Sequence, residues 1–338
     1  MDTVATMPRG DRADLFRETA ARMGLPSALI EKDFWVCWTL GQLFTIESLR
    51  QVLLFKGGTS LSKVFNLINR FSEDIDLAVD YAPLGFTGAR DPAKEMPKSR
   101  REKLLGEMMA ECQAFIAGDF IRALKKRIAH VLENREPWSL EARAADPNTI
   151  EFRYPPAFDE GVAYVTPAVL LELGTHAELI PSGRYRIQPF AATEFPSVFT
   201  TPDLEVNAIT AERTFWEKAT ILHVEHHRPK DKPTPLRYSR HYYDLAMMAN
   251  SSVRTAAVSD LPLLARVVAH KQKFYASAWA KYDVAVPPTL RLIPQEERVA
   301  DLKKDYEAMK VMIFGTAPSF DEVLASLESL QREINGAA

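Results

Sequence analysis

The sequence has few cysteines and little excess of charge. Among its 338 residues, only Cys37 and Cys112 are cysteines, and they lie far apart without neighbouring histidines. They form neither a zinc site nor a disulfide scaffold, which favours a reducing compartment. The formal net charge of −3 does not indicate a nucleic-acid binder, although a net charge can hide local patches.

The sequence also shows no pattern typical of a targeting signal or a membrane-spanning segment. Residues 1–24 carry acidic residues throughout and have no apolar core of signal-peptide length. No apolar run is long enough to span a bilayer. We therefore expect a cytoplasmic protein with no membrane partner. A composition of 46% apolar and 26% charged residues is ordinary for a globular chain.

The residue pattern predicts a mixed α/β half followed by a helical half. Apolar spacing predicts helices and strands in the first half, and it predicts mainly helices beyond Pro202, with Thr210 as a possible N-cap. We expect domains at 1–202 and 203–338. The expected helices cover 12–24, 26–45, 60–68 and 98–135, and the expected strands cover 51–55, 74–79, 149–155, 168–176 and 185–190.

A Gly57-Gly58 pair follows the apolar run QVLLF and precedes a helical pattern. Glycine lets the backbone approach an anion closely, so a strand, this turn and a helix are consistent with a phosphate site. A Walker A loop is excluded because Lys56 precedes the glycines, and a Rossmann fingerprint is absent. A plain tight turn remains the alternative.

Asp74 and Asp76 stand two residues apart in the predicted strand DIDLAV. In an extended strand they share one face, and Ile75 and Leu77 take the other. Two adjacent carboxylates repel each other and favour a cation, for which Mg²⁺ is well suited because it bridges carboxylates and substrate phosphates. A solvated acidic edge strand is the alternative.

Together these features resemble the nucleotidyltransferase superfamily of DNA polymerase beta. More narrowly, the segment KGGTSLSK…RFSEDIDL resembles the AbiEii/AbiGii (MenT-like) toxin family, as do EKDFWVCWTL (31–40) and RHYYDLAMM (240–248). The resemblance spans about residues 25–250. It implies an α+β fold with a polymerase-beta-like core, a mixed sheet flanked by helices, and a mainly helical C-terminal half that contributes to the site.

The resemblance also implies roles for individual residues. Asp74 and Asp76 would hold catalytic Mg²⁺ or Mn²⁺ ions that bridge an NTP substrate. Gly57, Gly58, Thr59 and Ser60 would cradle phosphate oxygens. Lys63 lies three or four positions after Thr59 and Ser60, so one helical face brings all three together. A solvated lysine is the alternative for Lys63.

Superfamily sites usually add a third carboxylate from a neighbouring strand. Glu172 is our choice because it interrupts the apolar run AVLLELGTH, where an unpaired buried carboxylate is costly. Glu151 and Glu178 are rivals. In the helical half, Lys218 resembles the family lysine that contacts the triphosphate. Asp244 resembles a family acidic position near the nucleotide or acting as general base. The alternatives are an exposed lysine for Lys218 and a helix-capping or salt-bridged aspartate for Asp244.

The segment HVEHHRPK (223–230) contains three histidines but does not match a zinc motif. The positive charge of this region is the better explanation of its composition, because basic residues dominate from His223 to His241. With the basic residues of 98–127, they would form walls for an RNA acceptor strand; two solvated basic loops are the alternative. The basic residues named for RNA binding are Arg228, Lys230, Lys232, Arg237 and Arg240.

The expected function is that of a metal-dependent nucleotidyltransferase toxin. The resemblance implies transfer of NMP to the tRNA 3′ end, a block of aminoacylation and translation, and a cognate antitoxin as partner. One alternative is NMP transfer to a protein or small-molecule hydroxyl. Another is a non-catalytic nucleotide- or RNA-binding regulator.

Overall fold

The computed structural model describes residues 1–133, 136–158 and 166–336. The chain divides into two compact units, and each is described by itself. Unit 1 comprises residues 1–64, 72–91 and 102–209, and unit 2 comprises residues 65–71, 92–101 and 210–338. The last change of unit therefore falls between Ile209 and Thr210, close to the boundary at 202 that the composition suggests.

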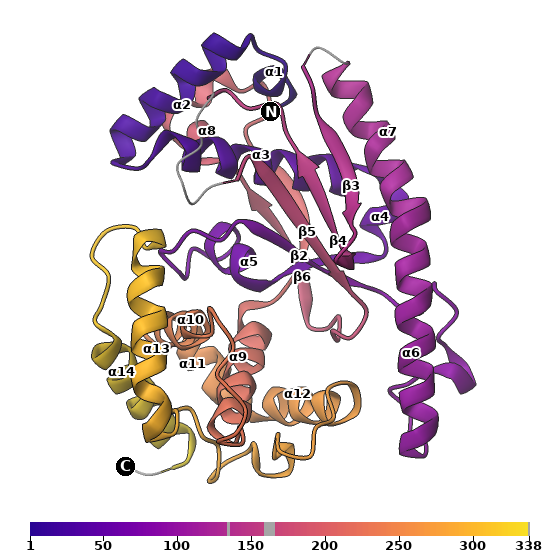
Figure 1. Ribbon diagram of the computed structural model, residues 1–338, viewed down its shortest axis with the longest axis vertical. Coiled ribbons are helices and arrows are strands. Elements are labelled where there is room, and N and C mark those ends of the chain that lie inside the picture. The colour runs from indigo at the N-terminus through magenta and orange to yellow at the C-terminus, as the bar shows by residue number, and fades with distance from the viewer. Residues whose placement is uncertain (134–135, 159–165, 337–338) are drawn as a thin grey trace. The chain divides into compact units, whose positions relative to one another are not determined.

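Unit 1 is built on a mixed sheet (Figure 1). In the described residues it has seven strands in the order β3-β4-β5-β2-β1-β7-β6. Strand β2 pairs in parallel with β5, and β1 pairs in parallel with β7, whereas the remaining neighbours are antiparallel. The strands are β1 (Leu53–Lys56), β2 (Asp74–Val79), β3 (Ser139–Arg143), β4 (Asp146–Arg153), β5 (Ala168–Gly174), β6 (Ser182–Ile187) and β7 (Leu204–Ile209).

Successive side chains of the central strands point to opposite faces of the sheet, and one face of the centre of this sheet is apolar. Phe55, Ile75, Leu77 and Leu171 are fully buried and belong to one large core cluster. Helix α3 (Ser27–Thr45), buried along almost its whole length, packs against β2, β5 and β7. Because neighbouring strand residues point to opposite faces, this packing directs Asp74 and Asp76 to the face that points away from the core.

The helices of unit 1 flank the sheet, and α6, a π-helical turn and α7 follow each other as one long helical stretch (Figure 1). Helix α6 begins within the segment 92–101 that belongs to unit 2. Besides α3, these elements are α1 (Asp2–Ala5), α2 (Arg9–Met23), α4 (Glu47–Arg50), α5 (Gly57–Lys63), η1 (Gly88–Arg90), α6 (Lys98–Phe115), η2 (Ile116–Phe120), α7 (Ile121–Leu132), α8 (Phe190–Glu194) and η3 (Pro196–Val198).

Unit 2 is helical in its described part, with α10 packed against α9, α13 and α14. The predicted cap is confirmed, since the Thr210 side chain accepts a hydrogen bond from the Arg213 backbone at the start of α9. Its elements are α9 (Ala211–His226), α10 (Ser239–Ala249), α11 (Val253–Ser259), α12 (Leu261–Phe274), η4 (Tyr282–Val284), α13 (Glu296–Met309), η5 (Lys310–Met312) and α14 (Phe320–Ile334).

The α+β fold class is confirmed, and the strand at 74–79 has the predicted bounds. Some local predictions were wrong. The helix expected at 60–68 begins at Gly57 and ends at Lys63, and strands β3 and β7 were not predicted. No helix in the described part of the chain is long and apolar enough to cross a membrane.

Candidate active site

Three carboxylates lie on two adjacent central strands of unit 1. Asp74 and Asp76 are half-buried, and Ile75 and Leu77 between and after them are buried. In the parallel register of β2 and β5, Asp76 is directly opposite Glu172. Residues opposite each other in register project from the same face of the sheet. Asp74, Asp76 and Glu172 therefore share the face that points away from the core.

Gly57 turns the chain beside Asp76. Lys56, the last residue of β1, is opposite Asp76, and Gly57 follows with φ of +81°. A Cβ atom built on Gly57 would lie 1.9 Å from Oδ2 of Asp76 and 2.5 Å from its Cγ. Only glycine combines this backbone angle with so close a carboxylate. The turn predicted to approach phosphate thus packs directly on one of the predicted metal ligands.

The side-chain hydroxyls of Thr59 and Ser60 donate hydrogen bonds to backbone carbonyl oxygens of the protein. The buried Thr59 hydroxyl donates to the Asp74 carbonyl oxygen at 2.5 Å. The buried Ser60 hydroxyl donates to the Gly57 carbonyl oxygen at 2.9 Å. Both hydroxyls therefore shape the turn and tie α5 to β2, and their contact with phosphate stays a prediction.

Lys63 has a partner that the sequence pattern did not indicate. Its ammonium donates to Oδ1 of Asp33 at 2.7 Å, with exposed fractions of only 8% for Lys63 and 3% for Asp33. It also lies 4.0 Å from the centroid of the Phe190 ring. Desolvation lowers the pKa of Lys63, but Asp33 and Cys37 together, through charge and hydrogen bonding, outweigh it and leave the pKa raised. Lys63 is thus a charged, buried residue, not a solvated one, and a phosphate contact stays a prediction.

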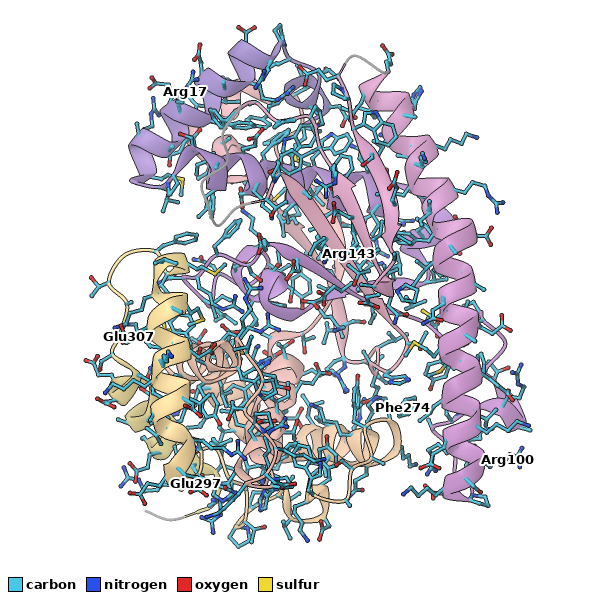
Figure 2. The ribbon with its side chains drawn as sticks, in the orientation of Figure 1. Arg17, Arg100, Arg143, Phe274, Glu297 and Glu307 are labelled. Atoms are coloured by element: carbon cyan, nitrogen blue, oxygen red, sulfur yellow. The ribbon has the colours of Figure 1, made fainter. Side chains whose placement is uncertain are left out.

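The two rivals of Glu172 differ from it in their surroundings. Glu151 on β4 forms ion pairs with Arg143, at 3.6 Å, and with Arg153; Arg143 is labelled in Figure 2. Glu178 lies beyond the end of β5, away from the strand register that aligns Asp76 with Glu172. Glu172 itself is exposed, so the expectation that it is buried was wrong. Its position opposite Asp76 is what places it beside the aspartates.

Lys218 and Asp244 form one buried cluster with Arg70 inside unit 2. Lys218 Nζ is 2.8 Å from Oδ2 of Asp244, and the Arg70 guanidinium donates to both oxygens of Asp244 at 2.7 and 2.9 Å. Burial alone would raise the pKa of Asp244, but the two cations hold it well below its usual range. Burial and the Arg70 charge lower the pKa of Lys218, against the attraction of Asp244.

A carboxylate bound in this way is a poor proton acceptor, so these contacts favour a role of Asp244 in holding Lys218 and Arg70 over a role as general base. His241, one helical turn away, has its pKa lowered well below the usual value by burial and by the Lys218 charge. It is therefore neutral near pH 7. The catalytic role expected for Asp244 stays a prediction.

The three histidines of HVEHHRPK hydrogen-bond to backbone carbonyls. His223 Nε2 is 3.0 Å from the Lys281 oxygen, His226 Nδ1 is 2.7 Å from the Ile293 oxygen, and His227 Nδ1 is 2.9 Å from the His223 oxygen. Burial lowers the pKa of His223 to about 4. These histidines are structural parts of unit 2, in agreement with the mismatch to a zinc motif.

The basic segment after α9 is partly neutralised by acids of α9 and α13. Arg228 binds both oxygens of Glu225 at 2.6 and 2.7 Å, and Lys230 pairs with Glu297 at 2.7 Å. Asp305 accepts from the Arg237 backbone N–H at 2.8 Å. The RNA contacts expected for Arg228, Lys230, Lys232, Arg237 and Arg240 stay predictions, and the nearby acids weaken the field they would supply.

The donor set on β2 fits a hard cation. Asp74 and Asp76 offer carboxylate oxygens from one face, the ligand type that Mg²⁺ and Mn²⁺ prefer. Among the described residues, no group of three or more His, Cys, Asp or Glu side chains is gathered as a preformed metal cage. A site of two carboxylates still suits Mg²⁺, which keeps several waters and takes further ligands from substrate phosphates.

Sequence reasoning missed Arg70, Lys32 and Asp33. Arg70 stands four residues before Asp74, and its partner Asp244 is far away in sequence, so no local pattern indicates the pair. For Lys32 and Asp33, the sequence does indicate that each residue needs a partner. They are charged residues in the middle of a helix whose other positions are almost all apolar, and a buried charge requires a partner.

In unit 1 a glycine turn packs on an acidic strand of a mixed sheet, and a match to a family model gives the class of protein, a nucleotidyltransferase. A family model described as the nucleotidyl transferase AbiEii toxin of type IV toxin–antitoxin systems matches residues 38–326. The chain therefore belongs to the AbiEii nucleotidyltransferase toxin family, which confirms the resemblance. Among solved structures it is similar to MenT4, a nucleotidyltransferase toxin from Mycobacterium tuberculosis H37Rv, at 15% identity over 98% of each chain with a TM-score of 0.40. No curated protein matches the sequence.

Proposed function

We propose that this chain transfers NMP from an NTP to an RNA acceptor, with the 3′ end of tRNA as the acceptor. The family supplies the reaction class. The observation that carries the assignment of the site is the contact between Gly57 and the Asp76 carboxylate, with Glu172 in register on the next strand. It supports a site in unit 1 at which a turn suited to phosphate lies beside the strands that carry Asp74, Asp76 and Glu172.

In this proposal the Gly57-Gly58 backbone receives the phosphates of the NTP. Glycine allows phosphate oxygens to approach the main chain, while Thr59 and Ser60 keep the turn in shape through their hydrogen bonds to Asp74 and Gly57. The helix that follows has only seven residues, so the proposal relies on close backbone approach more than on a helix dipole.

Asp74 and Asp76 would hold Mg²⁺ or Mn²⁺. When bound, such an ion neutralises charge on the phosphates and orients them for in-line displacement. The acceptor hydroxyl attacks the α-phosphorus, a new P–O bond forms, the bond to the β-phosphate oxygen breaks, and pyrophosphate leaves. Glu172 takes the proton of the hydroxyl, a role that its exposure and its position beside Asp76 support.

Lys218 and Asp244 remain part of the proposal through the family resemblance. Lys218 would contact the triphosphate, and Asp244 would hold the Lys218 ammonium in place by the 2.8 Å ion pair. Blocking the tRNA 3′ end would prevent aminoacylation and stop translation. As a member of a type IV toxin–antitoxin family, the protein would be neutralised by a cognate antitoxin.

The test is incubation of the purified protein with total tRNA and each of four α-labelled NTPs, with and without Mg²⁺. We expect label in tRNA with one or more NTPs, and only when Mg²⁺ is present. A 3′-phosphorylated tRNA sample serves as control, because it lacks the accepting hydroxyl and should stay unlabelled. Label in protein but not in RNA would contradict the proposed acceptor and favour NMP transfer to a protein hydroxyl. No label with any acceptor would contradict nucleotidyl transfer.

A further inference from the structure

Three consecutive charged residues lie inside helix α3. Glu31, Lys32 and Asp33 have exposed fractions of 3%, 2% and 3%. Burying charges costs several kcal/mol each unless good partners compensate. Each of the three has such a partner: Glu31 accepts from the Ala157 backbone N–H at 2.6 Å, and Lys32 and Asp33 bind residues at the ends of the two elements that carry the candidate site.

Asp33 binds the C-terminal end of α5, the helix that begins at the glycine turn. One of its oxygens accepts from Lys63 Nζ and the other from the Phe190 backbone N–H, both at 2.7 Å. Lys63 is the last residue of α5, the helix that begins at Gly57. Asp33 therefore fixes the end of α5 opposite to the turn.

Lys32 holds the beginning of the acidic strand. Its ammonium donates to Oε2 of Glu73 at 2.5 Å and to the Thr166 carbonyl oxygen at 3.1 Å. Glu73 directly precedes Asp74, the first residue of β2. The exposed fractions of the Lys32 and Glu73 side chains are 3% and 18%, so the pair is mostly withdrawn from water.

We infer that Lys32 and Asp33 are positioning residues that fix the glycine turn and the two aspartates relative to each other. Two neighbouring side chains of one buried helix hold both elements of the site, and the Thr59 bond to the Asp74 carbonyl links those elements directly. They act through Glu73 and Lys63 and do not touch the reacting atoms. Only the kinetic part of this inference rests on the proposed nucleotidyl transfer.

The chain offers a matched control for Lys32. Arg12 is another buried cation of unit 1, paired with Glu136 at 2.6 Å, with exposed fractions of 1% and 27%. It also donates to the Pro155 carbonyl oxygen, much as Lys32 binds Thr166. The Arg12 pair lies outside the segments 57–63 and 73–76. Arg12 also donates to the Ala5 and Met7 carbonyl oxygens, so its loss measures what removing a well-bonded buried cation from unit 1 does.

The first readout is amide hydrogen exchange, which needs no substrate. In K32M we expect peptides within 57–63 and 72–79 to exchange at least about tenfold faster than in the wild type. R12M should leave these peptides unchanged. The double variant D33N/K63Q, which removes both charges of the other pair, should speed exchange in 57–63. Unchanged exchange in K32M, or the same acceleration in R12M, would overturn the inference.

The second readout is the split between kcat and KM for the NTP, measured well below the unfolding temperature. Misplacing reacting groups by about 1 Å can cost about 100-fold in rate. We expect K32M to lower kcat by at least about tenfold while KM changes by less than about threefold, and R12M to change both by less than about twofold. Faster exchange in K32M with an unchanged kcat would also overturn the positioning role.

Two further variants keep the test decisive. If K32M does not fold, E73Q replaces it, because Glu73 is partly exposed and Lys32 then retains its bond to Thr166. The swapped pair K32E/E73K should restore at least part of the lost kcat, which a loss of packing would not allow. A wild type that transfers no nucleotide would contradict the proposed function, and the exchange data would then decide the inference alone.

Discussion

The Asp76 carboxylate occupies the space where any side chain on Gly57 would begin. A Cβ atom at Gly57 would lie 1.9 Å from Oδ2 of Asp76, and the φ of +81° at this glycine is one that other residues rarely adopt. The glycine and the aspartate are therefore one structural element. Gly57 and Asp76 are far apart in the sequence. The antiparallel pairing of β1 with β2, in which Lys56 is opposite Asp76, brings them into contact.

Replacing Gly57 by alanine should damage both the site and the fold. The new Cβ atom must displace the Asp76 carboxylate, and the backbone strain costs about 1–3 kcal/mol. We expect G57A to lose at least about 100-fold in nucleotide transfer, measured with labelled NTP. G24A is the control, since Gly24 has φ of +65° but nothing within 4 Å of its Cβ position. Equal activity of G57A and G24A would contradict the account.

Glu172 should be needed for the rate but not for stability. Because its side chain is exposed on β5, E172Q should change the free energy of unfolding by less than about 0.5 kcal/mol. Loss of a general base costs about 100- to 10,000-fold in rate. E151Q is the matched control, as Glu151 lies on the adjacent strand and pairs with arginines. A nucleotide-transfer rate in E172Q equal to that of the wild type would show that Glu172 is not the third carboxylate of the site.

Glu31 should make stability fall as pH rises. Burial raises the pKa of Glu31 to about 7 from an ordinary value of 4.5. The folded state therefore binds more protons than the unfolded state between these values, and stability decreases with rising pH across that window. The full difference corresponds to about 3 kcal/mol.

The glutamine variant tests this effect, because it keeps an oxygen to accept from Ala157. Chemical denaturation at pH 4.5 and pH 8 should show that E31Q gains stability relative to the wild type as pH rises. A difference between the two proteins that does not change with pH would contradict the shifted pKa. The comparison cancels the contributions of all other titrating groups.

Asp244 should be needed for the stability of unit 2. In D244N the buried charges of Arg70 and Lys218 lose their common partner, and removing one partner of a buried pair costs about 3–5 kcal/mol. D321N is the control, because its pair with Lys303 is exposed at 70% and 48%, and such pairs contribute at most about 1 kcal/mol. A D244N protein of unchanged stability that lacks activity would instead favour a direct catalytic role.

Local sequence patterns were enough to predict the strand that carries Asp74 and Asp76. The glycine pair and the alternation in DIDLAV are short-range features, and β2 has the predicted bounds. Strand β7 was missed because its parallel partner β1 lies about 150 residues earlier, and such a pairing leaves no local trace. Strand β3 was missed because it is an edge strand in which only Leu140 is buried.

The partners of charged residues were the least predictable part. Helical spacing placed Lys63 near Thr59 and Ser60, but its ammonium turns to Asp33, thirty residues away. The register of β5 against β2 puts Glu172 opposite Asp76, its catalytic role stays a prediction, and the reason given for choosing it, burial, was wrong. A single sequence shows that a charge needs a partner, whereas the identity of that partner depends on the tertiary fold.

The most direct test of the central claim is the rate of nucleotide transfer in D76N compared with D80N. Asp80 directly follows β2, and its carboxylate accepts from the Ala82 backbone N–H at 2.9 Å, so it controls for the loss of an acid near the same strand. The account predicts that D76N loses at least about 1,000-fold in labelled NMP transfer to tRNA while D80N stays within about threefold of the wild type. Transfer by a folded D76N at the rate of D80N would contradict it.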